Sequence, residues 1–228
     1  MRTIADNLYH VLNEITAVTK QILPASIMPP ILVAVSKTKP VDAILAAYQA
    51  GQQHFGENKV QEALQKFVPL RQRGLNLTLH LIGPLQTNKV ADAVSLFDVI
   101  HTLDREKLAI ALKNEMQVQQ RYPRLLVQVN VGREPQKAGI MPENAATFVE
   151  ECRAMGLPIQ GLMCIPPVNT DPRPHFEWLQ NSAHKLNLPE LSIGMSNDYK
   201  LAIQYQATYV RVGTAIFGAR ENKTVLAV

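Results

Sequence analysis

Short apolar runs alternate with amphipathic segments along almost the whole chain. The first run, Ile31 to Val35, contains no polar position, which is typical of a parallel strand covered on both faces. Comparable runs recur at intervals of about 25 residues. The pattern predicts eight strands, at 31–35, 53–55, 77–82, 97–101, 124–131, 158–165, 191–193 and 209–212.

The segments between these runs have the periodicity of helices. A further helix precedes the first strand, where Thr3 and Asp6 form an imperfect capping box. Its apolar stripe consists of Ile4, Leu8, Val11, Ile15, Val18 and Ile22. The other helices are predicted at 40–51, 59–71, 86–94, 104–121, 142–154, 174–186 and 198–206, and Asp104 is expected to cap the one that begins there.

Eight strands that alternate with helices predict an α/β protein, a single (β/α)8 TIM barrel over residues 1–228 with an extra N-terminal helix. The competing architecture is a doubly wound open sheet. That architecture usually has fewer strands, and its dinucleotide-binding form opens with a G-x-G-x-x-G motif that this sequence lacks. Only 15 residues follow Gly213, so the N-terminal helix is expected to help close the ring.

Composition narrows the class of protein. The net charge of +4 is spread along the chain, without the clustered basic stripe of a nucleic-acid binder. The sequence has no apolar run long enough for a membrane span and no signal peptide, so a cytoplasmic location is the default expectation. The two cysteines are expected to be small buried side chains, and the scattered histidines predict no metal site.

The residues that follow the strands carry the candidate chemistry, because the functional groups of such barrels lie at the carboxyl ends of the strands. Lys37 comes directly after the first strand, where a charged ammonium is costly and a neutral amine is a nucleophile toward carbonyl carbon. The loops after the last two strands, G-M-S-N-D and R-V-G-T-A, offer a hydroxyl and backbone N–H groups suited to a phosphate. In a closed barrel these loops adjoin Lys37, which suggests a phosphorylated aldehyde as the ligand.

Six segments resemble, in order, those of the YggS/PROSC-type pyridoxal phosphate homeostasis proteins. They are A-V-S-K-T-K-P, F-G-E-N-K-V-Q-E, H-L-I-G-P-L-Q-T-N-K, G-L-M-C-I-P-P, L-S-I-G-M-S-N-D and V-R-V-G-T-A-I-F-G-A-R. The resemblance implies a fold-type III barrel similar to the N-terminal domain of alanine racemase, with pyridoxal 5'-phosphate (PLP) as cofactor. Tyr199, where the family more often has methionine, and the tail at 221–228 depart from the family pattern.

The same resemblance implies six cofactor-binding residues and no catalytic or metal-binding ones. With their implied roles, they are Lys37 as the Schiff-base lysine that forms an internal aldimine, Asn58 near the ring, Ser196, Gly213 and Thr214 at the phosphate, and Arg211 at the pyridine nitrogen.

Two functions are compatible with such a site. The first is a monomeric protein that binds PLP and takes part in intracellular PLP (vitamin B6) homeostasis, with apo-enzymes as partners and without notable catalysis. The second is a PLP-dependent amino-acid racemase, which needs a positioned base on each face of the cofactor. The strand ends offer only Cys164 and His101 as neutral acid–base candidates. Lys137, after the fifth strand, is either a secondary amine for cofactor exchange or a solvated loop lysine.

Overall fold

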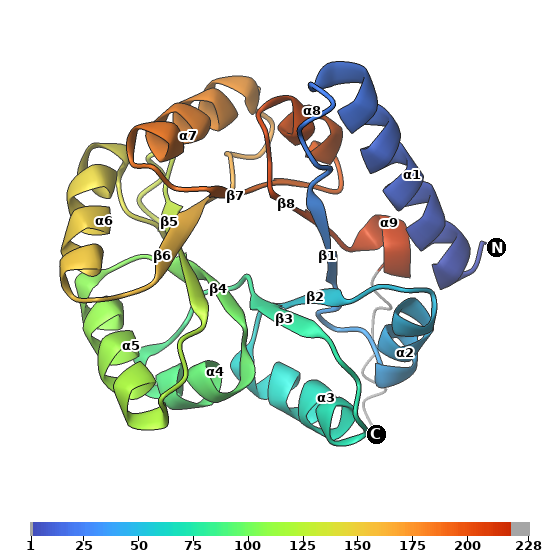
Figure 1. Cartoon of the computed structure of the whole chain (residues 1–228), viewed down its shortest axis with the longest axis horizontal. Helices are drawn as coiled ribbons and strands as arrows, with labels where there is room; N and C mark the ends of the chain where they lie inside the picture. Colours follow the sequence, from blue (N-terminus) through green and yellow to red (C-terminus); the bar gives the residue numbers. More distant parts are fainter. Residues whose placement is uncertain (1, 220–228) are drawn as a thin grey trace, which may run out of the picture.

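Eight parallel strands form a closed ring in which each strand pairs with the next and β8 pairs with β1 (Figure 1). This computed structural model describes residues 2–219. The ring confirms the predicted (β/α)8 barrel and excludes the doubly wound sheet, in which the outermost strands would be unpaired edges. The strands are β1 Ile31–Val35, β2 His54–Glu57, β3 Thr78–Leu81, β4 Val99–Leu103, β5 Arg124–Val129, β6 Ile159–Cys164, β7 Glu190–Met195 and β8 Tyr209–Val212.

Helices surround the ring and cover the outer face of the strands (Figure 1). Two of them are preceded by a turn of 3₁₀ helix, η1 Thr87–Lys89 and η2 Pro142–Asn144, and a one-turn helix that the sequence pattern did not predict follows β8. The α-helices are α1 Ile4–Ile22, α2 Val41–Gln49, α3 Val60–Gln72, α4 Val90–Leu96, α5 Glu106–Gln119, α6 Ala145–Ala154, α7 Arg173–Lys185, α8 Tyr199–Gln204 and α9 Thr214–Phe217.

The N-terminal helix α1 covers the place where the ring closes, and it packs against α2, α8 and α9 (Figure 1). Its capping box is complete: the Thr3 hydroxyl accepts from the Asp6 N–H at 3.1 Å, and the Asp6 carboxylate accepts from the Thr3 N–H at 2.9 Å. Ile22, the last residue of the predicted apolar stripe, is 42% exposed. Helical spacing identifies a face of a helix but does not say how far its neighbours extend along it.

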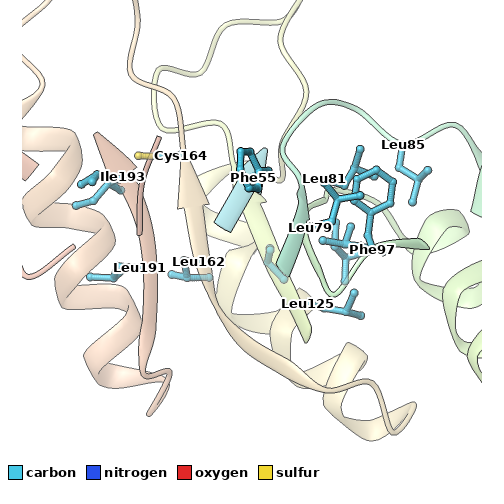
Figure 2. Close-up of a cluster of buried hydrophobic side chains, with 14 of the residues drawn as sticks. Phe55, Leu79, Leu81, Leu85, Phe97, Leu125, Leu162, Cys164, Leu191 and Ile193 are labelled. Carbon is cyan, nitrogen blue, oxygen red and sulfur yellow. The ribbon is translucent and has the colours of Figure 1, made fainter. Parts of the chain in front are cut away.

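The barrel has one apolar layer outside the strands and a smaller one inside. Successive residues of a strand point to opposite faces, so in β1 Leu32 and Ala34 belong to the outer layer and Val33 to the inner one. Figure 2 shows side chains of the outer layer from β2, β3, β5, β6 and β7. The inner layer consists of Val33, Val99, Leu126, Met163 and Tyr209.

Two expectations about the elements are wrong in detail. Asp104 does not cap α5, whose N-cap residue is Arg105; the Asp104 carboxylate pairs instead with the Arg105 guanidinium at 2.5 Å. The second strand continues to Glu57 rather than ending at Phe55. A buried carboxylate is tolerated at its end because Lys66 from α3 lies 2.5 Å from it.

None of the helices in the described part of the chain is long and apolar enough to cross a membrane. The tail at 221–228, which departs from the family pattern, lies outside the described residues. The boundaries of the single domain, 1–228, therefore stay a prediction.

Candidate functional site

A cavity of about 210 Å³ lies at the carboxyl ends of the strands. The six predicted cofactor-binding residues all line it, namely Lys37, Asn58, Ser196, Arg211, Gly213 and Thr214. They come together because ring closure places β8 and the loop after β7 beside β1 and β2. The rest of the wall is apolar and consists of Val35, Ile82, Ile165 and Met195. These four were not predicted, although the alternation of side chains along a strand places Val35 on the same face as Lys37.

Lys37 follows β1 on a loop whose backbone is fixed on its carboxyl side. Thr38 has a φ of 63°, an uncommon conformation for a residue other than glycine, and its N–H donates to Glu62 Oε1 at 2.5 Å. Lys39 donates from Nζ to the carbonyl oxygens of Phe217 and Gly218 at 3.0 and 3.1 Å. The loop after β1 is therefore tied to both α3 and the end of α9.

A buried ion pair fixes the residue on the other side of Lys37. Lys66 Nζ lies 2.5 Å from Glu57 Oε1 and 2.9 Å from Glu62 Oε1, and it donates to the Ser36 carbonyl oxygen at 2.8 Å. The Ser36 hydroxyl donates to Glu57 Oε1 at 2.7 Å. Burial raises the pKa of Glu57 above its ordinary value, although Lys66 and Ser36 act in the opposite direction.

The loops after β7 and β8 meet at Ser196 and Gly213, where the Gly213 N–H donates to Ser196 Oγ at 3.4 Å. A Cβ atom on Gly213 would lie 3.2 Å from the Val35 carbonyl oxygen, so glycine allows this loop to approach β1 closely. Thr214 begins α9, and the first N–H groups of a helix have no acceptor within it. A hydroxyl beside such N–H groups suits a phosphate.

Arg211 lines the cavity from β8 and is only 4% exposed. Its Nη1 donates to the carbonyl oxygen of Ser192 at 2.7 Å and to the hydroxyl of the same residue, and its Nη2 donates to the Cys164 carbonyl oxygen at 2.9 Å. A guanidinium has five N–H donors, so these three bonds leave two donors for a ligand. Burial lowers the pKa of Arg211, but an arginine remains protonated under any physiological condition.

Asn58 follows β2 and is held by the loop after β3. A Cβ atom on Gly83 would lie 2.3 Å from the Asn58 carbonyl oxygen, so only glycine permits this approach. The Thr102 hydroxyl donates to the Gly83 carbonyl oxygen at 2.8 Å and fixes the same loop from β4. Asn58 therefore lines the cavity from a backbone that cannot easily shift.

Three other residues singled out in the sequence do not line the cavity. Cys164 lies in the outer apolar layer beside Ile193 (Figure 2), and burial raises the pKa of its thiol to about 12. His101 is fully buried inside the ring and bonds to Ser192. Lys137 forms an ion pair with Glu134 in the loop after β5. Neither acid–base candidate therefore reaches a ligand in this cavity.

Comparisons with known proteins agree with this geometry. Residues 12–221 match the family model described as alanine racemase, N-terminal domain. A pyridoxal phosphate homeostasis protein of Haemophilus influenzae is 41% identical over 204 residues, which are 85% of this chain and 86% of that protein. The structure of PipY of Synechococcus elongatus with PLP bound has a TM-score of 0.78 at 38% identity, covering 95% of this chain and all of PipY (100%). An alanine racemase of Clostridium difficile has a TM-score of 0.70 at 15% identity over 96% of this chain and 58% of its own, a likeness of fold alone.

Proposed function

This chain belongs to the family of pyridoxal phosphate homeostasis proteins, and on that premise we propose that it binds PLP in the cavity at the carboxyl ends of β1, β2, β7 and β8. Its proposed role is to hold PLP and so to take part in PLP homeostasis, the function for which its relatives are named. PLP is the proposed cofactor. The residues proposed to bind it are the six that line the cavity, namely Lys37, Asn58, Ser196, Arg211, Gly213 and Thr214.

One observation carries the proposal: a single cavity holds three groups that match three parts of one ligand. Lys37 provides an amine for an aldehyde. The hydroxyl of Ser196 and the N–H groups at Gly213 and Thr214 suit a phosphate. Arg211 has two N–H donors left for a ring nitrogen. PLP carries an aldehyde, a phosphate and a ring nitrogen together, so the residues present fit it.

When bound, PLP supplies an electrophilic aldehyde carbon. Lys37 would be the residue that holds PLP at this carbon, because an amine is a nucleophile toward it. The contacts that fix the backbone at Ser36 and Thr38 would keep Lys37 at the cavity wall. Asn58, which lines the same cavity, would limit the movement of the cofactor.

We propose the cytoplasm as the place of action, the monomer as the active form, and PLP-dependent apo-enzymes as partners that receive the cofactor. Neither nucleic acid nor membrane is proposed as a partner. Lys137 stays a candidate for a secondary amine during the exchange of the cofactor. Its ion pair with Glu134 has to break before the amine can react. Light scattering of the eluting protein measures the oligomeric state, and mixing holo-protein with an apo-enzyme measures transfer.

Borohydride reduction tests the assignment of Lys37. Reduction of the PLP-loaded protein is expected to fix the cofactor on the peptide that contains Lys37, as mapped by mass spectrometry. Lys37→Ala should abolish the visible absorbance of the bound cofactor while the far-UV circular dichroism stays unchanged. Lys59→Ala removes an exposed lysine beside Asn58 and is the matched control, expected to retain full absorbance. Cofactor fixed on another lysine, or unchanged absorbance in Lys37→Ala, would contradict the assignment.

A further inference from the structure

Three histidines from neighbouring strands form a hydrogen-bonded chain inside the barrel. His54 Nδ1 lies 2.9 Å from His80 Nε2, and His80 Nδ1 lies 2.8 Å from His101 Nε2. His101 Nδ1 lies 2.8 Å from the hydroxyl of Ser192, which accepts a hydrogen bond from Arg211. This histidine chain crosses the barrel from β2 through β3 and β4, and it ends on the guanidinium that lines the cofactor cavity.

The histidine chain is shut off from water over most of its length. His80, His101 and Ser192 are fully buried, and His54 is half-buried. Tyr209 packs edge-on against His80 and His101, with ring centroids 5.3 and 5.4 Å apart. Burial is the main cause that lowers the pKa of all three histidines, and it favours their neutral forms. A neutral imidazole donates from one nitrogen and accepts at the other, so the chain has a direction.

Arg211 determines that direction. A guanidinium only donates, so Ser192 Oγ accepts from it and retains one proton to donate. Among residues 2–219 this hydroxyl forms no hydrogen bond to an acceptor other than His101 Nδ1. His101 then carries its proton on Nε2 and donates to His80, and His80 donates in the same way to His54. The opposite direction would leave the serine proton buried without an acceptor.

We propose that the histidine chain runs one way, with His54, His80 and His101 all as Nε2–H tautomers, and that Ser192 and His101 are positioning residues for the Arg211 guanidinium. The functional part of this inference rests on the proposed function, because Arg211 is the residue proposed to meet the ring nitrogen of PLP.

The guanidinium needs such support because no carboxylate of residues 2–219 forms an ion pair or a hydrogen bond with it, and Asp198 acts on it only through its charge. In the described part of the chain its hydrogen-bond partners are two carbonyl oxygens and one hydroxyl. With every histidine as the Nε2–H tautomer, the lone-pair ends of the imidazole dipoles face Arg211, and oriented dipoles of this kind stabilise a positive charge in a medium of low dielectric constant. A carboxylate in place of the Ser192 hydroxyl could accept two parallel hydrogen bonds from Arg211. The hydroxyl accepts only one, so that two N–H donors of the guanidinium stay available to a ligand in the cavity.

The direction of the histidine chain can be measured without PLP. Two-bond ¹H–¹⁵N spectra of the full chain, labelled with ¹⁵N-histidine and recorded at neutral pH, report which nitrogen of each imidazole carries the proton. His54→Gln, His80→Gln and His101→Gln assign the signals. All three residues are expected as neutral Nε2–H tautomers. An Nδ1–H tautomer or an imidazolium at His80 or His101 would overturn the proposal.

Ser192→Ala tests the positioning role, since it removes the hydroxyl and keeps the carbonyl acceptor. We expect a mixture of tautomers at His101 and His80, a Kd for PLP raised about tenfold, and a shifted absorption maximum of the bound cofactor. Ser192→Thr restores the hydroxyl and should return all three readings toward the original values. Met163→Leu alters the inner apolar layer outside the histidine chain and is the packing control, expected to change none of them.

The outcomes separate this inference from the proposed function. Unchanged tautomers and an unchanged Kd in Ser192→Ala would refute the positioning role. If Ser192→Ala does not fold, His101→Phe breaks the same link and is read in the same way. A protein that fails to bind PLP would refute the proposed function, while the tautomer measurement would still decide the direction of the chain.

Discussion

Lys66 Nζ lies 2.5 Å from Glu57 Oε1, and the two side chains are 9% and 0% exposed. The pair reaches the candidate site through the residues beside Lys37. Lys66 donates to the Ser36 carbonyl oxygen, the Ser36 hydroxyl donates to Glu57, and Glu62, the second partner of Lys66, accepts from the Thr38 N–H. A buried ion pair contributes little net stability, but the loss of one partner is costly because the other charge stays buried. The pair is therefore best understood as a support for the backbone that carries Lys37.

Lys66→Met should lower the free energy of unfolding by about 3–5 kcal/mol, because it leaves the Glu57 carboxylate buried without a counter-ion. It should also weaken PLP binding, because the Ser36 carbonyl oxygen loses one of its two donors and keeps only the Lys39 N–H. Urea unfolding and PLP titration measure the two effects. Lys59 is exposed and is the N-cap residue of the same helix. Lys59→Met is the matched control, and its free energy of unfolding should stay within about 0.5 kcal/mol of that of the original protein.

Glu57→Gln combined with Lys66→Met separates the charge from the packing. The double variant buries a neutral amide in place of an uncompensated carboxylate, so it should recover part of the stability lost in Lys66→Met. A double variant that is as unstable as Lys66→Met alone would show that the pair acts through packing and not through charge.

The strands, and the cavity in which the six candidate residues meet, could be predicted from the sequence because both follow from local patterns and the topology of the barrel. An unbroken apolar run such as Ile31–Val35 indicates a buried strand by itself. Once eight such strands are arranged as a closed barrel, the topology places Lys37 beside the loops of Ser196 and Gly213 without any knowledge of side-chain contacts.

The histidine chain could not be predicted in this way, because it depends on how three strands align. The Glu57–Lys66 pair could not either, because it depends on how α3 packs against β2. His54, His80 and His101 are 26 and 21 residues apart and belong to no common motif. They meet only because neighbouring parallel strands place side chains of one face at similar heights inside the ring.

His80 and His101 should make the fold sensitive to mild acid. Burial is the main cause that lowers the pKa of both well below the ordinary 6.5, assisted by His101 for His80 and by Arg211 for His101. Below about pH 6.5 these two histidines bind protons in the unfolded chain but not in the folded chain. The free energy of unfolding therefore falls as the pH is lowered toward the folded-state pKa. Each histidine contributes a slope of about 1.4 kcal/mol per pH unit in that window.

Urea unfolding between neutral pH and about pH 5 measures this slope, because the window lies just below the ordinary histidine pKa. His80→Gln should make the slope shallower by the contribution of one histidine, whatever its effect on stability at neutral pH. His184→Gln removes an exposed histidine on α7 and is the control for the loss of an imidazole as such; it should change the slope less than His80→Gln does. An identical slope in His80→Gln and the original protein would contradict the prediction.

Tyr199, the departure from the family's usual methionine, links α8 to α1. Its hydroxyl donates to Glu14 Oε2 at 2.5 Å, and Lys200 lies at the other oxygen of the same carboxylate. Both lower the pKa of Glu14, Lys200 more strongly. Tyr199→Phe should lower the free energy of unfolding by about 1.5 kcal/mol at neutral pH and leave PLP binding unchanged, because Tyr199 does not line the cavity.

The pH dependence of this difference tests its cause. Since the folded-state pKa of Glu14 lies below 4.5, the stabilisation is present above that pH and is lost as the pH falls through the folded-state pKa. The original protein and Tyr199→Phe should therefore converge in stability on acidification, as measured by urea unfolding. A difference that persists after Glu14 is protonated would indicate a packing effect of the hydroxyl instead.

The cavity contains few groups that could exchange a proton with an amino acid. Apart from Lys37, its described polar side chains are the amide of Asn58, the hydroxyls of Ser196 and Thr214, and the guanidinium of Arg211. A racemase needs a positioned base on each face of the cofactor, and general acid–base catalysis contributes about 10²–10⁴-fold for each such group. Arg211 can donate a hydrogen bond to the ring nitrogen but holds its own proton too tightly to protonate it, which weakens the ring as an electron sink.

The protein is therefore expected to turn over amino acids only slowly. Incubation of the PLP-loaded protein with L-alanine in deuterated water measures this, with exchange at Cα followed by NMR and enantiomeric purity by chiral chromatography. Lys37→Ala gives the background rate, and an alanine racemase under the same conditions gives the positive control. Slow exchange that is seen only at high protein concentration agrees with a protein that holds PLP without using it. Robust racemisation that disappears in Lys37→Ala would overturn this expectation, and it would require a base that reaches the cavity from outside the described residues or from a second molecule.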